Sequence, residues 1–380
     1  NRLLRLIADA FRAGFEKALI TRVGDDHFAL LTVWDDQTCE RLAAVIKRIG
    51  QRALGRATAV KAGISPQTGK TKNDAVKALD QARFAAKCVG TDLRQRYVVY
   101  SPNIDDEYWS QRYIRDKFST AIEKQWITVF YQPIIRAKTG KICNFEALAR
   151  WIDPVKGLIA PDTFIPVLEK YHLIPQLGAY MLEQVIRQVK SCAAAGLPLE
   201  PVSVNLSVLD FEANDMVGLI VSLLKKYDVK PKWIVVEITE RDIAQTANAF
   251  RQPIRALRRH GIQVWVDDFG SGYSALNVLN QYEFDLLKLD MQFLRQLDEH
   301  HGANRVIIKS IVRAAHELGV QTLTEGVETE VHHRFLKEAG CDKEQGYYFA
   351  KPRPMEESLQ EVRGLPRETE EEARQYGRRS

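Results

Sequence analysis

Apolar, β-branched stretches that each end in a polar side chain recur seven times in the last two-thirds of this chain. Their final polar residues, in chain order, are Glu146, Asn205, Glu237, Asp267 with Asp268, Lys288 with Asp290, Glu325, and Gln345. One such ending is ordinary, because acidic and amide residues favour turns and helix N-caps. Seven in succession predict parallel strands that deliver polar groups to one mouth. A (β/α)₈ TIM-like barrel builds its active site in this way, at the C-terminal ends of its strands.

The spacing of these endings agrees with an α/β barrel. Asn205 and Glu237 are 32 residues apart, and Glu237 and Asp267 are 30 residues apart. Each interval holds one strand and one crossover helix. The longer interval from Glu146 to Asn205 contains extra helical material, including the run 180–195. We therefore expect the barrel domain to span residues 126–360.

The side chains at the predicted mouth are mostly carboxylates, with amides and one lysine and no His or Cys. Hard oxygen ligands of this kind favour Mg²⁺ or Mn²⁺ over zinc. Asp267 and Asp268 are adjacent, and neighbouring carboxylates repel each other unless a cation lies between them. The Gly-Ser-Gly sequence at 270–272 predicts a mobile loop directly after this pair. The sequence thus predicts a metalloenzyme.

The remaining segments predict a smaller α+β domain and two connecting pieces. Apolar positions at helical spacing over 3–19 precede two short strands, 19–22 and 28–33, around a tight turn. Helix, strand, helix and strand are expected at about 37–50, 57–64, 73–89 and 97–100. We assign residues 1–103 to this domain, 104–125 to a linker helix, and 361–380 to a charged tail that is either an exposed helix or disordered.

The composition limits the kind of ligand that the protein binds and the cellular compartment in which we expect it. A net charge of +5 permits an anionic ligand without indicating a DNA or RNA surface. Five scattered cysteines without CxxC spacing predict reduced thiols and a cytoplasmic location. No run approaches the length of a membrane span. The chain begins with Asn, which leaves open an upstream sensor or membrane region and a cytoplasmic portion of an anchored protein.

In this order, the motifs from Tyr131-Gln132-Pro133-Ile134 to Lys351-Pro352 resemble the EAL-domain family of cyclic di-GMP phosphodiesterases. They include Glu146-Ala147-Leu148, the 267–274 segment Asp-Asp-Phe-Gly-Ser-Gly-Tyr-Ser and the strand endings above. Two departures are minor, because Ala149 stands where Leu is usual and Thr324 where Ala is more common. Neither removes a ligand.

The resemblance implies a site with two Mg²⁺ or Mn²⁺ ions. Glu146, Asn205, Glu237 and Asp267 would ligate the first ion, and Asp267 and Asp268 the second. Lys288 would contact the attacking water, and Glu325 would be the general base or a partner of the second metal. Glu328 would hold the loop after Asp268, so Glu328→Ala should lower metal affinity and turnover. The groups expected to contact or orient the substrate are Gln132, Leu148, Arg150, Asp290 and Gln345.

The chemistry of these groups agrees with that implication. Two metals about 3.5 to 4 Å apart can activate a water and stabilise the leaving oxygen of an in-line displacement. A lysine beside that water favours its deprotonated form. Arg150 suits a phosphate, because its planar guanidinium donates paired hydrogen bonds. The expected reaction opens one phosphodiester of cyclic di-GMP and leaves linear pGpG.

The segment 21–30, Thr-Arg-Val-Gly-Asp-Asp-His-Phe-Ala-Leu, is similar to the signature of GGDEF-domain diguanylate cyclases. Asp25 replaces its second glycine and His27 its catalytic glutamate. Phe15 and Ala18 occupy the places of the inhibitory Arg-x-x-Asp, and the family's first strand and phosphate loop are absent from this chain. The resemblance implies a degenerate, incomplete GGDEF domain without cyclase activity that is regulatory or dimerising.

Three alternatives remain open from the sequence. The complete set of ligands favours an enzyme over a receptor that binds cyclic di-GMP without cutting it and signals through a protein partner. In the third alternative, the protein is a structural module whose first domain binds a partner. The resemblance also implies a homodimer through the EAL domain. The basic run Arg251, Arg255, Arg258, Arg259 and His260 is interpreted as a solvated outer helix face or, alternatively, a partner contact.

Overall fold

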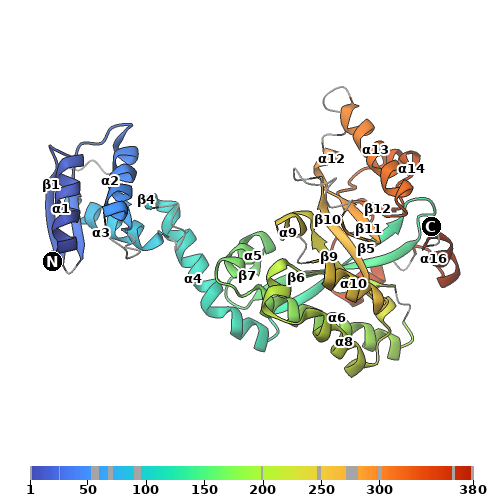
Figure 1. Cartoon of the computed structure of the whole chain (residues 1–380). Coiled ribbons are helices and arrows are strands. Elements are labelled where there is room, and N and C mark those ends of the chain that lie inside the picture. The colour runs from blue at the N-terminus through green and yellow to red at the C-terminus, as the bar shows by residue number, and fades with distance from the viewer. Residues whose placement is uncertain are drawn as a thin grey trace. The chain divides into compact units, whose positions relative to one another are not determined.

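The computed structural model describes residues 2–24, 26–52, 60–66, 72–89, 96–197, 200–245, 250–270, 281–295, 297, 302–361 and 364–377. The chain divides into two compact units, Asn1–Tyr113 and Ile114–Ser380. Their boundary falls inside the long helix α4 (Pro102–Glu123) (Figure 1).

The first unit is the α+β domain that the sequence pattern predicts. Its remaining elements are α1 (Arg2–Gly14), β1 (Leu19–Gly24), β2 (His27–Leu31), α2 (Thr38–Arg52), β3 (Ala62–Ile64), α3 (Lys72–Cys88) and β4 (Tyr97–Val99). β1 and β2 form an antiparallel hairpin, and β3 pairs with β4 in parallel. The apolar core includes Phe11 of α1, Phe15 directly after α1, and Ile46 of α2. Asp25 of the predicted turn lies outside the described residues.

The second unit contains a closed barrel of eight strands among the residues described. They are β5 (Ile127–Arg136), β6 (Ile142–Asp153), β8 (Val202–Asn205), β9 (Ile234–Thr239), β10 (Gln263–Phe269), β11 (Leu286–Leu289), β12 (Gln321–Thr324) and β13 (Lys343–Glu344). The ring closes because β5 pairs with both β6 and β13. The short strand β7 (Gly157–Ile159) extends the sheet beside β6. The barrel interior is filled by apolar side chains such as Trp265 and Leu286.

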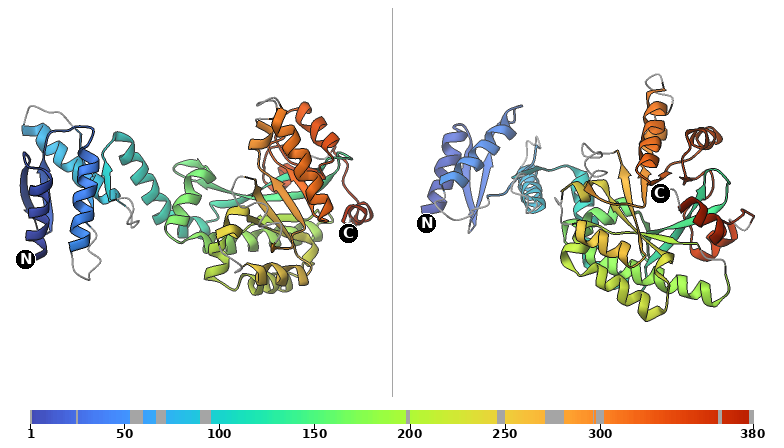
Figure 2. Two further views of the ribbon diagram at one scale, coloured as in Figure 1. Left: turned by 45° about the horizontal axis from the view of Figure 1, so that its top comes forward. Right: turned by 45° about the vertical axis from the view of Figure 1, so that its right-hand side comes forward.

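Helices surround these strands (Figures 1 and 2). They are α5 (Pro161–Lys170), α6 (Ile174–Ala194), α7 (Val208–Ala213), α8 (Met216–Tyr227), the 3₁₀ turn η1 (Pro231–Trp233), α9 (Glu240–Gln245), α10 (Arg251–Arg259), α12 (Gln292–Arg295), α13 (Ala303–Glu317), α14 (Glu330–Ala339), α15 (Met355–Glu361) and α16 (Glu370–Gly377). The long interval between Glu146 and Asn205 is occupied by α5 and α6. Among the described residues, no helix is both long and apolar enough to cross a membrane.

The seven strands predicted to be parallel are parallel, and the barrel departs from a regular (β/α)₈ arrangement only at β5 among the described strands. The strands from β6 to β13 that carry the polar endings run parallel, but β5 is antiparallel to both of its neighbours. The reason is local: only a tight turn around Gly140 joins β5 to β6, and a parallel pair needs a crossover of about a dozen residues. Glu146 also lies within β6 rather than at its end, because this strand of 12 residues continues far enough to pair with β7.

The C-terminal tail was expected to be an exposed helix or disordered, and this is wrong for its first residues. α16 is indeed a mostly exposed helix. However, Pro366 and Glu368 exchange backbone hydrogen bonds with Ile142 at the start of β6. The Glu368 carboxylate accepts two hydrogen bonds of 2.8 Å from Arg136, and both side chains are at most 5% exposed. The segment is therefore attached to the barrel by a buried ion pair.

Candidate active site

Seven of the predicted side chains converge at the C-terminal end of the barrel strands. Glu146 comes from β6, Asn205 from the end of β8, Glu237 from β9, Asp267 from β10, Lys288 from β11, Glu325 from the residue after β12 and Gln345 from the residue after β13. Direct hydrogen bonds and ion pairs connect all seven. The structure therefore brings these seven predicted residues together, and their roles in binding metal or substrate stay predictions.

Lys288 lies at the centre of the cluster and is fully buried. Its Nζ is 2.7 Å from Glu237 Oε2, 2.8 Å from Glu325 Oε1 and 3.1 Å from Asp267 Oδ1. Glu146 Oε1 is more distant, at 3.4 Å. Burial acts to lower the pKa of this ammonium, but the four surrounding carboxylates outweigh it and raise the pKa well above its usual value. Lys288 therefore carries a positive charge at the centre of the site.

Glu146 is oriented by two amide side chains. Asn205 Nδ2 donates to its Oε1 at 2.9 Å, and Gln345 Nε2 donates to its Oε2 at 2.6 Å. Burial acts to raise the pKa of Glu146, but Lys288 and these hydrogen bonds lower it overall. Glu146 is thus held as a carboxylate with a defined direction.

The other acids of the cluster are crowded by like charge. Burial, together with the charges of Glu146 and Asp267, raises the pKa of Glu237 well above its usual value, although Lys288 opposes the shift. Burial and the same two neighbouring charges raise the pKa of Glu325 to about 8. Burial and Asp267 raise the pKa of Asp268 to about 6. The site holds more negative charge than its own lysine can neutralise.

Two overlapping groups of carboxylates have the geometry of a metal site. Glu146, Glu237 and Asp267 form one group, and Asp267, Asp268 and Glu325 form the other. Within each group, the ligand oxygens lie within 4.8 Å of one another. Glu237 Oε1 is buried and has no hydrogen-bond partner among the described residues. A buried carboxylate oxygen without a partner, beside excess negative charge, fits a hard divalent cation.

The residues predicted to contact or orient the substrate differ in burial and in the hydrogen bonds that they already make within the protein. Gln132 is buried, donates to Ala350 O and accepts from Gln345, so its amide supports the network around Glu146. Arg150 is half-buried and donates to Ala149 O at 2.8 Å. Leu148 precedes it on β6 and is partly exposed. Asp290 accepts from Gln292 N–H at 2.6 Å and thereby caps α12. Their contacts with substrate remain predictions.

The backbone after Asp267 adopts an unusual conformation. Asp268 has φ 54° and Gly270 has φ 92°, both in the left-handed region that favours glycine. A Cβ atom at Gly270 would also lie 2.5 Å from the Phe293 ring. Glycine is therefore favoured at position 270, and Asp268 adopts a conformation that few residue types other than glycine, Asn and Asp accept.

Glu240 holds the backbone two residues after Asp268, and no sequence pattern predicted this role. Its Oε2 accepts a hydrogen bond of 2.7 Å from Gly270 N–H, and the residue is 1% exposed. Glu328, which was expected to hold this loop, has an exposed side chain. The loop residues 271–280 lie outside the described residues, so the role of Glu328 stays a prediction. The only sequence signal for Glu240 is its position three residues after Glu237, at the start of a helix. Acidic residues are common there because they interact favourably with the helix dipole, so this position does not by itself indicate a functional role.

Comparisons with known proteins agree with this geometry. The family model described as EAL domain matches residues 115–352. The bifunctional diguanylate cyclase/cyclic di-GMP phosphodiesterase MucR of Pseudomonas aeruginosa is 30% identical over 369 residues, which is 95% of this chain and 53% of the relative. The cyclic di-GMP phosphodiesterase PdeR of Escherichia coli is 30% identical over 363 residues, or 93% and 54%.

A solved structure described as the PaMucR phosphodiesterase in complex with c-di-GMP is also similar. It is 32% identical, covers 64% of this chain and 98% of its own, and has a TM-score of 0.61. The present chain spans about half the length of the curated relatives described above.

Proposed function

Because the chain belongs to the EAL domain family, we propose that it hydrolyses one phosphodiester bond of cyclic di-GMP and releases linear pGpG. MucR and PdeR are named as cyclic di-GMP phosphodiesterases, which supports this substrate. In the reaction, the oxygen of water bonds to phosphorus while the bond from phosphorus to O3′ breaks. The departing O3′ then takes up a proton.

The observation that carries the proposal is that Asp267 belongs to both carboxylate groups of the site. If all are ionised, the five carboxylates of these groups exceed the charge of Lys288 by four, which two divalent cations would neutralise. Glu146, Asn205, Glu237 and Asp267 would hold one Mg²⁺ or Mn²⁺, and Asp267 and Asp268 the other. When bound, these ions would lower the pKa of a water and stabilise negative charge on the leaving oxygen.

The protein's own groups would position this reaction. The Lys288 ammonium attracts the anionic form of a nearby water by its charge. Glu325 would accept a proton once bound cations lower its pKa, which burial and the charges of Asp267 and Glu146 raise to about 8 in the site without metal. Arg150 can direct its remaining guanidinium N–H groups to a phosphate, and Gln345 keeps Glu146 in place.

We assign a regulatory or dimerising role without cyclase activity to the first unit, as a degenerate GGDEF domain. Its α+β elements and the antiparallel hairpin of β1 and β2 support this assignment. A homodimer through the barrel unit is supported by the outer face of α13. Val306 and Ile307, near the N-terminal end of α13, are 66% and 42% exposed, and Leu318, which follows its last residue, is 58% exposed.

Incubation of the full chain with cyclic di-GMP and Mg²⁺ or Mn²⁺, followed by chromatography of the nucleotides, tests the function. We expect pGpG from the parent, none with EDTA and none from Glu146→Ala. Glu200→Gln is the matched control, because Glu200 is also buried but pairs with Arg367 away from the site. Binding of cyclic di-GMP without any pGpG would favour the receptor alternative. Absence of both binding and turnover would refute the proposal.

A further inference from the structure

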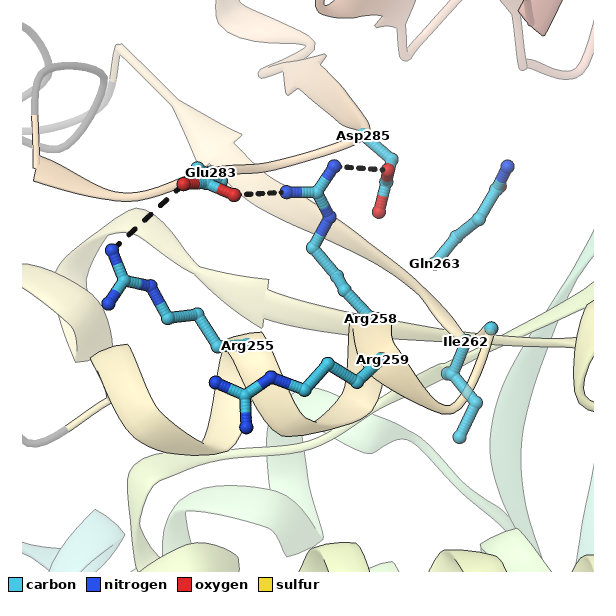
Figure 3. A pocket seen from close by; sticks show the side chains of 8 residues that line it. Arg255, Arg258, Arg259, Ile262, Gln263, Glu283 and Asp285 are labelled. Atoms are coloured by element: carbon cyan, nitrogen blue, oxygen red, sulfur yellow. Dashed lines mark hydrogen bonds and ion pairs between the residues drawn. The ribbon is translucent and has the colours of Figure 1, made fainter.

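The surface of the barrel unit has a hollow of about 590 Å³ at the C-terminal end of α10 (Figure 3). Arg255, Arg258 and Arg259 line it on the helix side, and Glu283 and Asp285 line it on the side of the chain that enters β11. Gln263, the first residue of β10, is also part of the wall. This helix carries the basic run that is expected from the sequence to be a solvated outer face or a partner contact.

The hollow is separate from the candidate active site. Gln263 begins β10, whereas Asp267 and Asp268 come four and five residues later in the same strand. At about 3.3 Å per residue, the two places are roughly 13 Å apart along the strand. Asp285 precedes β11, and Lys288 lies towards the far end of that strand. No residue of the hollow belongs to the two carboxylate groups.

Arg258 is the rigid part of the wall. Its Nη1 donates to Glu283 at 2.9 Å and its Nη2 to Asp285 at 3.2 Å. Asp285 in turn accepts a hydrogen bond of 2.8 Å from Val264 N–H in β10. Figure 3 shows the Arg258 guanidinium between the two carboxylates. Arg258 therefore neutralises most of the negative charge of Glu283 and Asp285.

Arg255 and Arg259 are held less tightly than Arg258. Arg255 forms only a long ion pair with Glu283, at 4.0 Å, without a hydrogen bond (Figure 3). Arg259 is exposed, and within the described ranges the structure shows no ion pair for it. Four residues separate the two arginines on α10, so they are neighbours on one helix face. Figure 3 shows both side chains extending along this face of the helix.

We propose that this hollow binds a small phosphate-bearing anion through Arg255 and Arg259. Two arginines one helical turn apart can both reach the oxygens of a phosphoryl group, because each guanidinium donates paired, charge-assisted hydrogen bonds. The volume lies within the range of small-molecule sites. None of the lining residues is aromatic, so the wall offers no ring for a nucleobase to stack on. The phosphoryl group is therefore the recognised part, whether it belongs to inorganic pyrophosphate or to a nucleotide.

Calorimetric titration of the full chain with inorganic pyrophosphate, in EDTA and at low salt, tests the site independently of turnover. We expect saturable binding that weakens about tenfold in Arg255→Gln and in Arg259→Gln, since each loses a charged hydrogen-bond donor. Glu283→Gln is expected to tighten binding severalfold, because it removes the carboxylate nearest Arg255. Arg313→Gln is the matched control, because Arg313 is an exposed arginine on α13 that pairs with Glu317.

Titration with GMP beside pyrophosphate identifies the source of the phosphoryl group. Tighter binding of GMP would assign the site to a nucleotide, and tighter binding of pyrophosphate would assign it to an inorganic anion; both support the site. Absence of saturable binding for both compounds would overturn the proposal. Equal weakening by Arg313→Gln and Arg259→Gln would also overturn it, because the binding would then reflect only overall charge.

Discussion

Glu240 offers a sensitive test of how the site is held together. Its carboxylate accepts the N–H of Gly270 at 2.7 Å, and this glycine follows Asp268 by two residues. The backbone of Asp268 is in the left-handed region, which a non-glycine residue rarely adopts. We expect Glu240→Ala to release the backbone at Asp268 and so to misplace a predicted metal ligand.

The magnitude follows from the type of bond that is lost. A hydrogen bond to a charged group contributes about 1.5–3 kcal/mol, and Glu240 is almost fully shielded from water. Each 1.4 kcal/mol corresponds to a factor of ten, so Glu240→Ala should lower kcat/KM by roughly tenfold to 150-fold. Glu240→Gln retains a neutral acceptor of about half the strength, which predicts a loss of about threefold to tenfold.

The assay is release of pGpG at a series of Mn²⁺ concentrations. If Glu240 acts through Asp268, the concentration of Mn²⁺ that gives half-maximal activity should rise in both variants, and excess Mn²⁺ should restore part of the loss. Glu200→Gln again controls for the loss of a buried carboxylate elsewhere. Activity and metal requirement within twofold of the parent in Glu240→Ala would refute the reasoning.

Three further outcomes are expected. Without metal, the raised pKa values of Asp268, about 6, and Glu325, about 8, mean that these groups are protonated below those values and release protons as pH rises. Calorimetric Mn²⁺ affinity should therefore increase at least about tenfold from pH 6 to pH 8, and equal affinities would contradict these shifts. Glu368→Gln removes the charge that pairs with the buried Arg136. We therefore expect the free energy of unfolding, measured in urea, to fall by about 3 kcal/mol without a change of turnover at 25 °C. A change below about 0.5 kcal/mol would contradict a structural role for this ion pair. Val306→Asp places a charge on the exposed apolar face of α13 and should convert a dimer to a monomer in light scattering; an unchanged mass would exclude this face as the interface.

The sequence alone determined the order and chemistry of the candidate site. Strand endings such as Asn205 and Glu237 recur at the spacing of one βα unit, and the C-terminal ends of neighbouring parallel strands meet at one edge. A local pattern therefore predicted a shared location for distant residues. Carboxylate composition likewise indicated a hard cation, since ligand preference depends on the atoms and not on their arrangement.

The tertiary structure decided what depends on contacts between distant segments. The direction of β5 follows from a turn too short for a crossover. The central position of Lys288 among four carboxylates, the hydrogen bond from Gly270 to Glu240 and the ion pair between Arg136 and Glu368 each join segments separated by 21 to 232 residues. Hydrophobic periodicity records which face of an element is buried, but it carries no information about which polar groups meet there. Those partners are selected only when the barrel closes and brings the strand ends within hydrogen-bond distance.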